Sequence, residues 1–248
     1  MSWESHPPSA SFEINADEEP SVTLLAGFSE FGLAGLTAVE YLVEQLSLEQ
    51  TGHITAEKLP TITPFENGQP RHHTRLFSRP DLDVTILVGE LFVPVWAADS
   101  FADAILDWTG ANGVEEIAVL SGVPVPHGPE EHRVFYIATE GYRRNRLDGI
   151  DVPGMGRGFL DGANATLVGR GIDSDLETGV FVTPVHARTP DVEAALRLID
   201  AISDVYELAV DTGPLEAFAD EVSEYYTELA ARVEAANDAD RPDDRMYM

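Results

Sequence analysis

The sequence contains no cysteine and only one lysine, Lys58. The absence of cysteine excludes disulfide bonds, thiol catalysis and zinc sites built from thiolates. Residues 1–16 lack the basic start and the apolar run of a signal peptide. No stretch approaches the run of about 18 apolar residues that would indicate a membrane-spanning helix. We therefore expect a cytoplasmic protein without a membrane segment.

Positive charge is also scarce, because 15 basic residues stand against 44 acidic ones and the formal net charge is −29. Such a surface should repel nucleic acids and anionic lipids unless basic residues gather locally. The one candidate cluster is Arg143, Arg144 and Arg146, which we interpret as a solvated or interface face of a helix. A carboxylate-rich surface with so little lysine favours a halophilic protein over an acidic mesophilic one, since a Debye length of about 3 Å in molar salt screens self-repulsion.

Strand and helix patterns alternate along most of the chain. Residues 22–26 and 84–88 are short apolar runs, as in strands buried on both faces of a sheet. Residues 36–46 repeat apolar side chains at helical spacing. This alternation predicts an α/β domain in which helices cover both faces of a mostly parallel sheet. Further strands are expected at 11–15, 53–57, 72–77, 117–120, 134–138 and 179–182, and further helices at 97–108, 139–147, 159–170 and from Pro190 to 206.

Both ends of the chain differ from this α/β domain, which we place at residues 11–210. Residues 1–10 are polar and contain prolines, so we expect a loose arm. Residues 237–248 are too polar to form a core and are expected to be a flexible tail. Between them, residues 214–236 form a predicted helix that could pack on this domain or on the same helix of another subunit. Its apolar seam consists of Leu215, Phe218, Val222, Tyr225 and Leu229.

The tail ends abruptly in Met246-Tyr247-Met248. Tyr247 combines a flat apolar ring with a hydroxyl that can orient it, and Met246 suits an irregular apolar gap. The terminal carboxylate of Met248 can pair with a lysine or with clustered backbone N–H groups. The plain alternative is that the triplet is a frayed chain end without a function. An apolar residue followed by a penultimate tyrosine would arise by chance in about 1% of chains with this composition. We predict that the triplet docks into a pocket on another protein, and that residues 238–245 give it a reach of roughly 25 Å.

A glycine-punctuated turn follows the strand at 22–26. Gly27, Gly32 and Gly35 superficially resemble a phosphate-binding loop, but the turn lacks the lysine and hydroxyl of a P-loop and the spacing of a dinucleotide site. A tight turn and close helix–sheet packing are the plainer explanation. Glu90 lies just beyond the strand at 84–88, at the edge where open α/β sheets bind ligands, and could act as a general acid or base.

No catalytic residue, cofactor or metal site is predicted beyond this turn. His127 and His132 flank two glutamates, but nothing there has an established metal-ligand spacing. The residue patterns alone therefore leave three functional hypotheses open. One is an interaction protein that uses its terminal triplet, and another is a nucleotide- or nucleoside-handling α/β enzyme that uses the Gly27–Gly35 turn and Glu90. The third is a structural oligomer that makes no such contact.

Three short motifs occur in a characteristic order. They are Leu24-Leu25-Ala26-Gly27-Phe28 with Gly32-Leu33-Ala34-Gly35, then Val119-Leu120-Ser121-Gly122, and finally Pro190-Asp191 with Ala194-Ala195. Together they make the chain resemble the proteasome assembly chaperone 2 family in its archaeal branch. The sequence departs from that family's pattern at Ser29-Glu30-Phe31, where relatives often carry a more apolar turn, and at Val192, where a second proline is common.

The resemblance implies an α/β fold akin to that of nucleoside phosphorylases, no established catalysis, no cofactor and assembly into homo-oligomers. It also implies a role for Met246-Tyr247-Met248. The triplet matches the hydrophobic–tyrosine–any-residue tag (HbYX motif) by which family members and proteasome activators enter pockets between α subunits of the 20S core. On this resemblance we expect a chaperone-like protein whose partners are 20S α subunits and further copies of itself. Related sequences have been labelled ATP-grasp-like, which keeps the enzyme alternative open.

Overall fold

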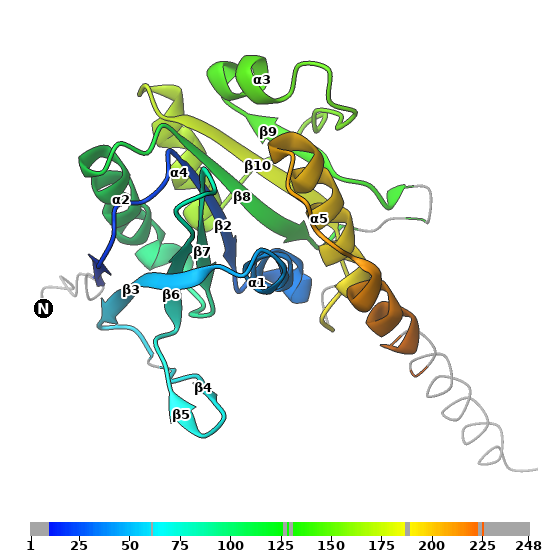
Figure 1. The fold of residues 1–248 in the computed structure, drawn as a ribbon. Coiled ribbons are helices and arrows are strands. Elements are labelled where there is room, and N and C mark those ends of the chain that lie inside the picture. The colour runs from blue at the N-terminus through cyan, green and yellow to red at the C-terminus, as the bar shows by residue number, and fades with distance from the viewer. Residues whose placement is uncertain are drawn as a thin grey trace, which may run out of the picture. The chain divides into compact units, whose positions relative to one another are not determined.

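The computed structural model describes residues 10–60, 62–125, 128, 131–186, 189–222 and 225. Contacts divide the chain into two units, residues 1–210 and residues 211–248. The first unit contains a large sheet and its covering helices (Figure 1). No helix in the described part of the chain is long and apolar enough to cross a bilayer.

An eight-stranded sheet organises the first unit, with the strand order β1-β3-β6-β7-β2-β8-β10-β9. The four central strands β7, β2, β8 and β10 are parallel, and the remaining pairings are antiparallel. The bounds are β1 (Ser11–Ala16), β2 (Thr23–Phe28), β3 (Glu49–Glu57), β6 (Thr74–Ser78), β7 (Val84–Gly89), β8 (Glu116–Val123), β9 (Phe135–Ala138) and β10 (Glu177–Pro184).

The predicted α/β class is confirmed, and parallel pairing is concentrated in the middle of the sheet. The strands β7 and β8 lie on either side of β2 and run parallel to it. The connections between these strands contain helices, which return the chain to the edge of the sheet where each strand begins. The short turn between β6 and β7 reverses the chain and makes that pair antiparallel. The outer strands therefore turn a parallel centre into a mixed sheet.

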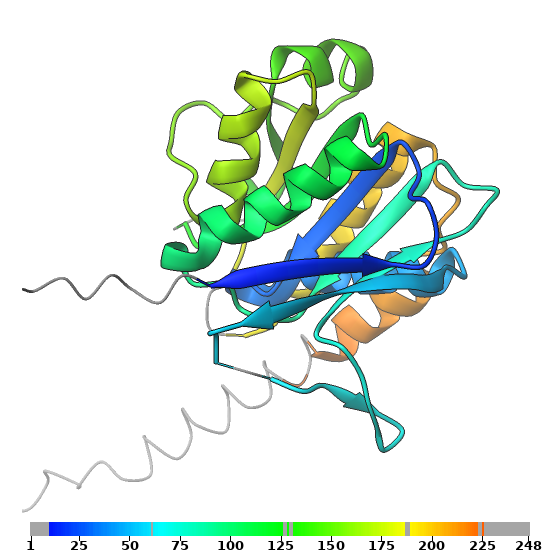
Figure 2. The ribbon, with the colours of Figure 1, turned by 90° about the vertical axis from the view of Figure 1, so that its left-hand side faces the viewer.

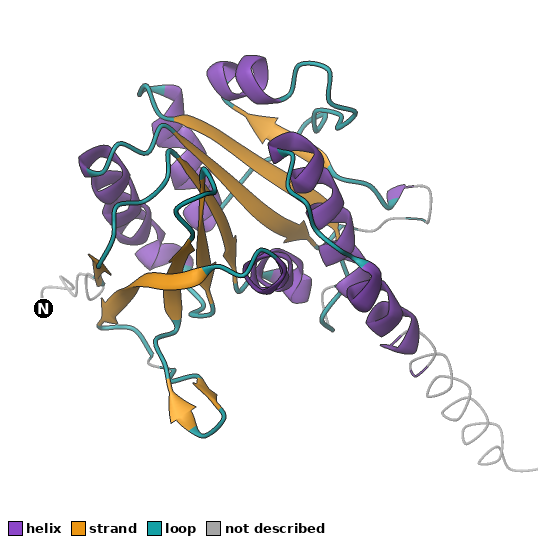
Figure 3. Ribbon diagram, viewed as in Figure 1, coloured by secondary structure: helices purple, strands orange, loops and turns teal. Residues whose placement is uncertain are grey.

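Helices cover both faces of the sheet (Figure 3). On one face α1 (Ala34–Gln45) packs against α5 (Val192–Tyr206), and on the other α2 (Val95–Ala111) packs against α4 (Gly162–Ile172). A short helix, α3 (Glu140–Arg146), contacts β10. Figure 2 shows α2 and α4 from their own side. Every residue of β2 and β7 is buried, which explains why both strands are uninterrupted apolar runs.

Aromatic packing joins α2 to the sheet. Phe101 of α2 meets Phe28 at the end of β2 edge to face, with ring centroids 5.4 Å apart. It meets Phe12 of the outermost strand, β1, in the same geometry at 5.0 Å. Such edge-to-face pairs are each worth about 0.5–1.5 kcal/mol beyond the area they bury. One helix side chain thus connects a central strand with the edge of the sheet.

Two local predictions need correction. The helix expected to open at Pro190 begins at Val192, because the Asp191 side chain accepts a hydrogen bond from the Ala194 N–H at 3.0 Å and caps it. The strand expected from residue 72 begins at Thr74. A small hairpin, β4 (Phe65–Glu66) with β5 (Gln69–Pro70), was not predicted, since each of its strands is only two residues long.

The second unit is helical over residues 213–222 and at residue 225. Two members of the predicted apolar seam are exposed, Phe218 by 52% and Tyr225 by 62%. The seam residue Leu229 lies outside the described residues, as do Met246, Tyr247 and Met248.

Candidate functional site

The predicted glycine turn lies at the carboxyl edge of the parallel strands. Gly27 is on β2, Gly32 is in the 3-10 turn Phe31–Leu33, and Gly35 is in the first turn of α1. A Cβ atom added to Gly27 would lie 2.2 Å from the carbonyl oxygen of Gly35. One added to Gly35 would lie 1.9 Å from the carbonyl oxygen of Leu120 on β8. These two glycines therefore let the backbone of α1 rest directly on the sheet, and they leave no cradle for a phosphate at that point.

Replacing Gly35 by alanine should therefore destabilise the fold. The added methyl group would collide with backbone rather than with a mobile side chain, so α1 must shift away from β8. We expect a loss of about 1–3 kcal/mol in the free energy of unfolding, measured by urea denaturation. Gly169→Ala in α4 is the matched control, because its Cβ would meet open space. Equal stability of Gly35→Ala and Gly169→Ala would contradict this packing role.

Glu90 is bound by arginines rather than held free as a general base. Its carboxylate accepts hydrogen bonds from both terminal nitrogens of Arg71, and it lies 3.4 Å from Arg75 Nη2. Glu40 of α1 lies 3.8 Å from the same Arg75 nitrogen, and Glu66 of the β4–β5 hairpin lies 3.8 Å from Arg71 Nε. Burial, followed by the charge of Glu90, raises the pKa of Glu40. The cluster therefore connects the hairpin and α1 to the sheet.

A polar cluster that the sequence did not predict lies beside the glycine turn. Ser121 Oγ of β8 donates to Glu30 Oε2 at 2.5 Å, and Asn164 Nδ2 of α4 donates to both Glu30 oxygens at 3.1 Å. Burial raises the pKa of Glu30 in spite of these hydrogen bonds. We call Glu30, Ser121 and Asn164 the carboxyl-edge trio. In the sequence Glu30 stands out only as part of the Ser29-Glu30-Phe31 departure from the family pattern, whereas in the structure both other members of the trio bind it.

The raised pKa of Glu30 has a measurable consequence. The folded protein holds this proton more tightly than the unfolded chain, whose carboxyl has the ordinary pKa of 4.5. The contribution of Glu30 to the free energy of unfolding is therefore fully present at pH values below the unfolded pKa, and it is lost as the pH rises through the folded pKa. Glu30→Gln removes the titration and keeps an oxygen that can accept from Ser121. We expect wild type to lose stability relative to this variant as the pH rises above the unfolded pKa, in urea denaturation at each pH. Parallel pH profiles would contradict the shift.

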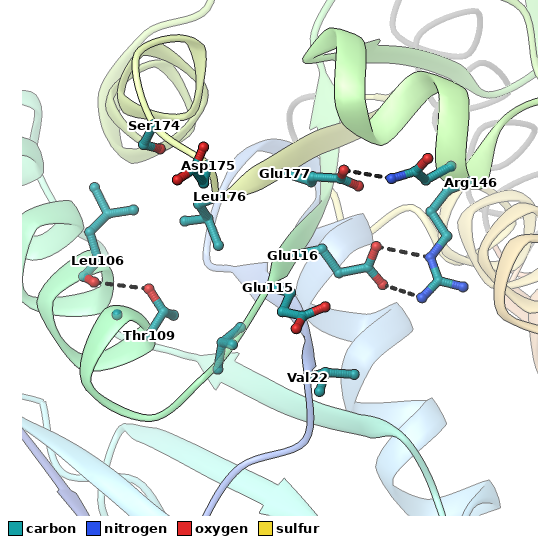
Figure 4. Close-up of a pocket in the computed structure, with 13 residues that line it drawn as sticks. Val22, Leu106, Thr109, Glu115, Glu116, Arg146, Ser174, Asp175, Leu176 and Glu177 are labelled. Atoms are coloured by element: carbon teal, nitrogen blue, oxygen red, sulfur yellow. Dashed lines mark hydrogen bonds and ion pairs between the residues drawn. The ribbon is translucent and has the colours of Figure 1, made fainter.

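The amino edge of the sheet carries a cavity of about 710 Å³, at the start of β2, β8 and β10 (Figure 4). Glu115, Asp175 and Glu177 are among its acidic lining residues, and Leu106 of α2 and Leu176 are among its apolar ones. Asn145 of α3 donates a hydrogen bond to Glu177 Oε1 at 2.6 Å. The cavity thus lies at the end of the parallel strands opposite to the glycine turn.

One of the three clustered arginines lines this cavity and is paired with a buried carboxylate. Arg146 Nε and Nη2 bind the two oxygens of Glu116 at 2.9 and 2.8 Å, and Glu116 is only 5% exposed. Thr23 Oγ1 donates to the same carboxylate at 2.6 Å. The Arg146 guanidinium also lies 5.0 Å from the ring centroid of Tyr206 in α5. Arg143 and Arg144 are exposed, as expected for a solvated face, whereas Arg146 is half-buried and connects α3 to β8.

Metal coordination has no support within the described ranges, which contain no group of three histidine, aspartate or glutamate residues able to hold an ion. His127 falls outside those ranges. The ring of His132 lies at right angles to that of His186, with centroids 6.3 Å apart.

Comparisons with known proteins complete this description. The model of the PAC2 family matches residues 24–230. No curated protein sequence is detectably similar to the chain. Among solved structures, Pyrococcus furiosus PbaA, described as an archaeal homolog of proteasome-assembly chaperone, superposes with a TM-score of 0.80 at 19% identity, over 92% of this chain and 95% of its own.

Two other archaeal structures have similar folds. Pyrococcus furiosus PbaB, described as an archaeal proteasome activator, has a TM-score of 0.74 at 21% identity, over 89% of this chain and 99% of its own. A protein of unknown function from Thermoplasma acidophilum has a TM-score of 0.72 at 22% identity, over 91% of each chain. At these identities the structural likeness establishes the fold.

Proposed function

The chain belongs to the PAC2 family, and on that premise we propose that it is a proteasome-binding, chaperone-like protein that docks its last three residues into pockets of 20S α subunits. The single observation that carries the proposal is the triplet Met246-Tyr247-Met248 at the end of a chain of this family. PbaA and PbaB, which share its fold, are described as a proteasome-assembly chaperone homolog and a proteasome activator.

The triplet supplies three different contacts. Tyr247 is the main anchor, because its ring buries a large apolar area while its hydroxyl makes an oriented hydrogen bond. Met246 fills the adjoining apolar space, and the terminal carboxylate of Met248 pairs with a basic side chain or with backbone N–H groups of the pocket. The acidic stretch that precedes the triplet gives it reach and keeps the apolar end in solution.

Self-association would present several triplets to one ring of α subunits. A single three-residue contact is weak, but linked copies bind with a high effective concentration. Phe218 and Tyr225, which are exposed on the helix of the second unit, offer apolar area for contact between copies. In this proposal self-association of the folded units sets the number of triplets, and the triplets make the contact with the α subunits. The protein acts in the cytoplasm and needs no bound cofactor.

Pull-down of α subunits from the same cell tests the proposal, in a buffer of high salt that suits the net charge of −29. The full chain should capture α subunits, and a chain that ends at Arg245 should not. Light scattering of both proteins controls for a change in oligomeric state. Equal capture by both chains would rule out docking by the tag, and no capture by either would rule out the proteasome as partner.

A further inference from the structure

The carboxyl-edge trio lies where open α/β sheets commonly bind small ligands. β2 and β7 are neighbouring parallel strands, and the helices that follow them, α1 and α2, belong to the pairs that cover opposite faces. The crevice between two such strands opens at their carboxyl ends. Glu30 follows β2 at this point, and the Ser29 N–H donates to the Gly89 carbonyl oxygen of β7 at 2.8 Å. The Glu30 side chain binds Ser121 of β8, the strand on the other side of β2.

One acceptor of the trio has no partner. Asn164 is only 5% exposed, and its Nδ2 is used by Glu30 and Ser121. Its Oδ1 is buried and accepts no hydrogen bond from any described residue. Buried polar atoms are nearly always paired in folded proteins, so an unpaired one needs an explanation. A ligand that donates a hydrogen bond to Oδ1 provides it.

Glu30 offers a second acceptor beside the first. Its two carboxylate oxygens have room for about four hydrogen bonds. Ser121 and Asn164 donate three contacts between them, two of which share one Asn164 nitrogen. Glu30 is partly exposed, so a ligand can reach it from solvent. The trio therefore offers hydrogen-bond acceptors to a ligand, and the ligand must supply the donors.

Exposed aromatic rings stand on the loops that meet at this edge. Phe31 follows β2 and Phe92 follows β7, with exposed fractions of 57% and 66%. Trp96 at the start of α2 is 47% exposed, and Phe159, just before α4, is fully exposed. The two helices run side by side from this edge, because Thr166 binds Asp99 at 2.9 Å and, one turn further, Arg170 binds Asp103 at 3.1 Å. Aromatic faces and buried acceptors are therefore found at the same edge.

We infer that the carboxyl-edge trio binds a planar nitrogen heterocycle that presents N–H donors, of which an amino-substituted purine is the simplest example. Asn164 Oδ1 accepts one N–H and the Glu30 carboxylate accepts another, while the ring stacks on an exposed aromatic side chain such as Trp96 or Phe159. Gly27 and Gly35 make no contact with the ligand in this arrangement, since neighbouring backbone atoms occupy the space beside them. Glu90 takes no part in this site, because its carboxylate is held by Arg71 and Arg75.

Calorimetric titration of the full chain with adenine tests the site, and unsubstituted purine, which lacks the exocyclic amine, is the matched ligand. We expect saturable binding of adenine and about tenfold weaker binding of purine, since a buried acceptor left unpaired is penalised. Asn164→Leu removes the acceptor at similar volume, together with the Nδ2 donor to Glu30 and Ser121, and should weaken adenine binding at least about tenfold. Glu30→Gln replaces one acceptor oxygen by an N–H donor and should also weaken it. Glu177→Gln at the amino edge is the control and should bind adenine as wild type does.

Quenching of Trp96 fluorescence by adenine gives a second readout, in which Trp3→Phe and Trp108→Phe remove the other two tryptophans. Binding of adenine and purine with equal affinity would overturn the inference, as would no saturable binding of adenine or unchanged binding to Asn164→Leu. These variants keep Met246–Met248 intact, so loss of heterocycle binding can be separated from loss of proteasome binding.

Discussion

Tyr247→Ala should lower the affinity for the 20S core by about 30-fold, which corresponds to about 2 kcal/mol and to a typical interface hot spot. The ring is the largest apolar group of the terminal triplet, and no other residue there can supply both a flat face and an oriented hydroxyl. Surface plasmon resonance with immobilised 20S measures the change. In the proposed multivalent contact several tags engage together, so the loss in an oligomer should exceed the loss for a single tag.

A rearranged tail is the sharpest control. Met246→Tyr combined with Tyr247→Met keeps the composition, charge and apolar area of the tail and moves only the tyrosine. This double variant should bind as poorly as Tyr247→Ala, whereas Tyr247→Phe should retain part of the affinity through its ring. Full affinity of the rearranged tail would show that general stickiness, rather than a tyrosine at the penultimate position, drives the contact.

The second large effect concerns the Glu116–Arg146 pair. Arg146→Leu leaves Glu116 buried without its cation, and breaking such a pair costs about 3–5 kcal/mol. Water can reach Arg146, whose side chain is 36% exposed, so we expect the lower end of that range. This corresponds to a fall of about 6–12 °C in melting temperature for a domain of this size. Differential scanning calorimetry measures it.

Two controls separate the ion pair from a general loss of charge on α3. Arg144→Leu changes the same helix at an exposed position and should alter stability by less than about 0.5 kcal/mol. Glu116→Gln combined with Arg146→Leu should cost less than the sum of the single changes, because the carboxylate is no longer left unpaired. Additive effects, or equal effects of Arg144→Leu and Arg146→Leu, would contradict the role assigned to the pair.

The main elements could be predicted from the sequence because their patterns are local. Buried parallel strands such as β2 and β7 are continuous apolar runs, and α1 repeats apolar residues at helical spacing. The direction of the outer strands depends on turns and partners, so the mixed character of the sheet could not be deduced. The start of α5 was missed by two residues because Asp191, rather than Pro190, is the cap.

The candidate sites were less predictable, since they join residues that are far apart in the chain. Ser121 and Asn164 are 91 and 134 residues from Glu30, and no local pattern shows that they meet. Arg146 is likewise 30 residues from Glu116 along the chain. Nothing in the local sequence distinguishes it from Arg143 or Arg144. The packing role of Gly27 and Gly35 was foreseen, because a strand, a glycine turn and a helix in succession imply close backbone contact.

Photo-crosslinking from position 247 is the most direct test of docking by the tag. A photoreactive phenylalanine analogue replaces Tyr247 in the full chain, which is then irradiated with the 20S core at high salt. We expect covalent adducts with α subunits, and we expect them to vanish in the presence of excess peptide ending in Met-Tyr-Met. Adducts with other proteins only, or α-subunit adducts that are equally abundant when the analogue is moved to position 240, would contradict docking of the terminal tag.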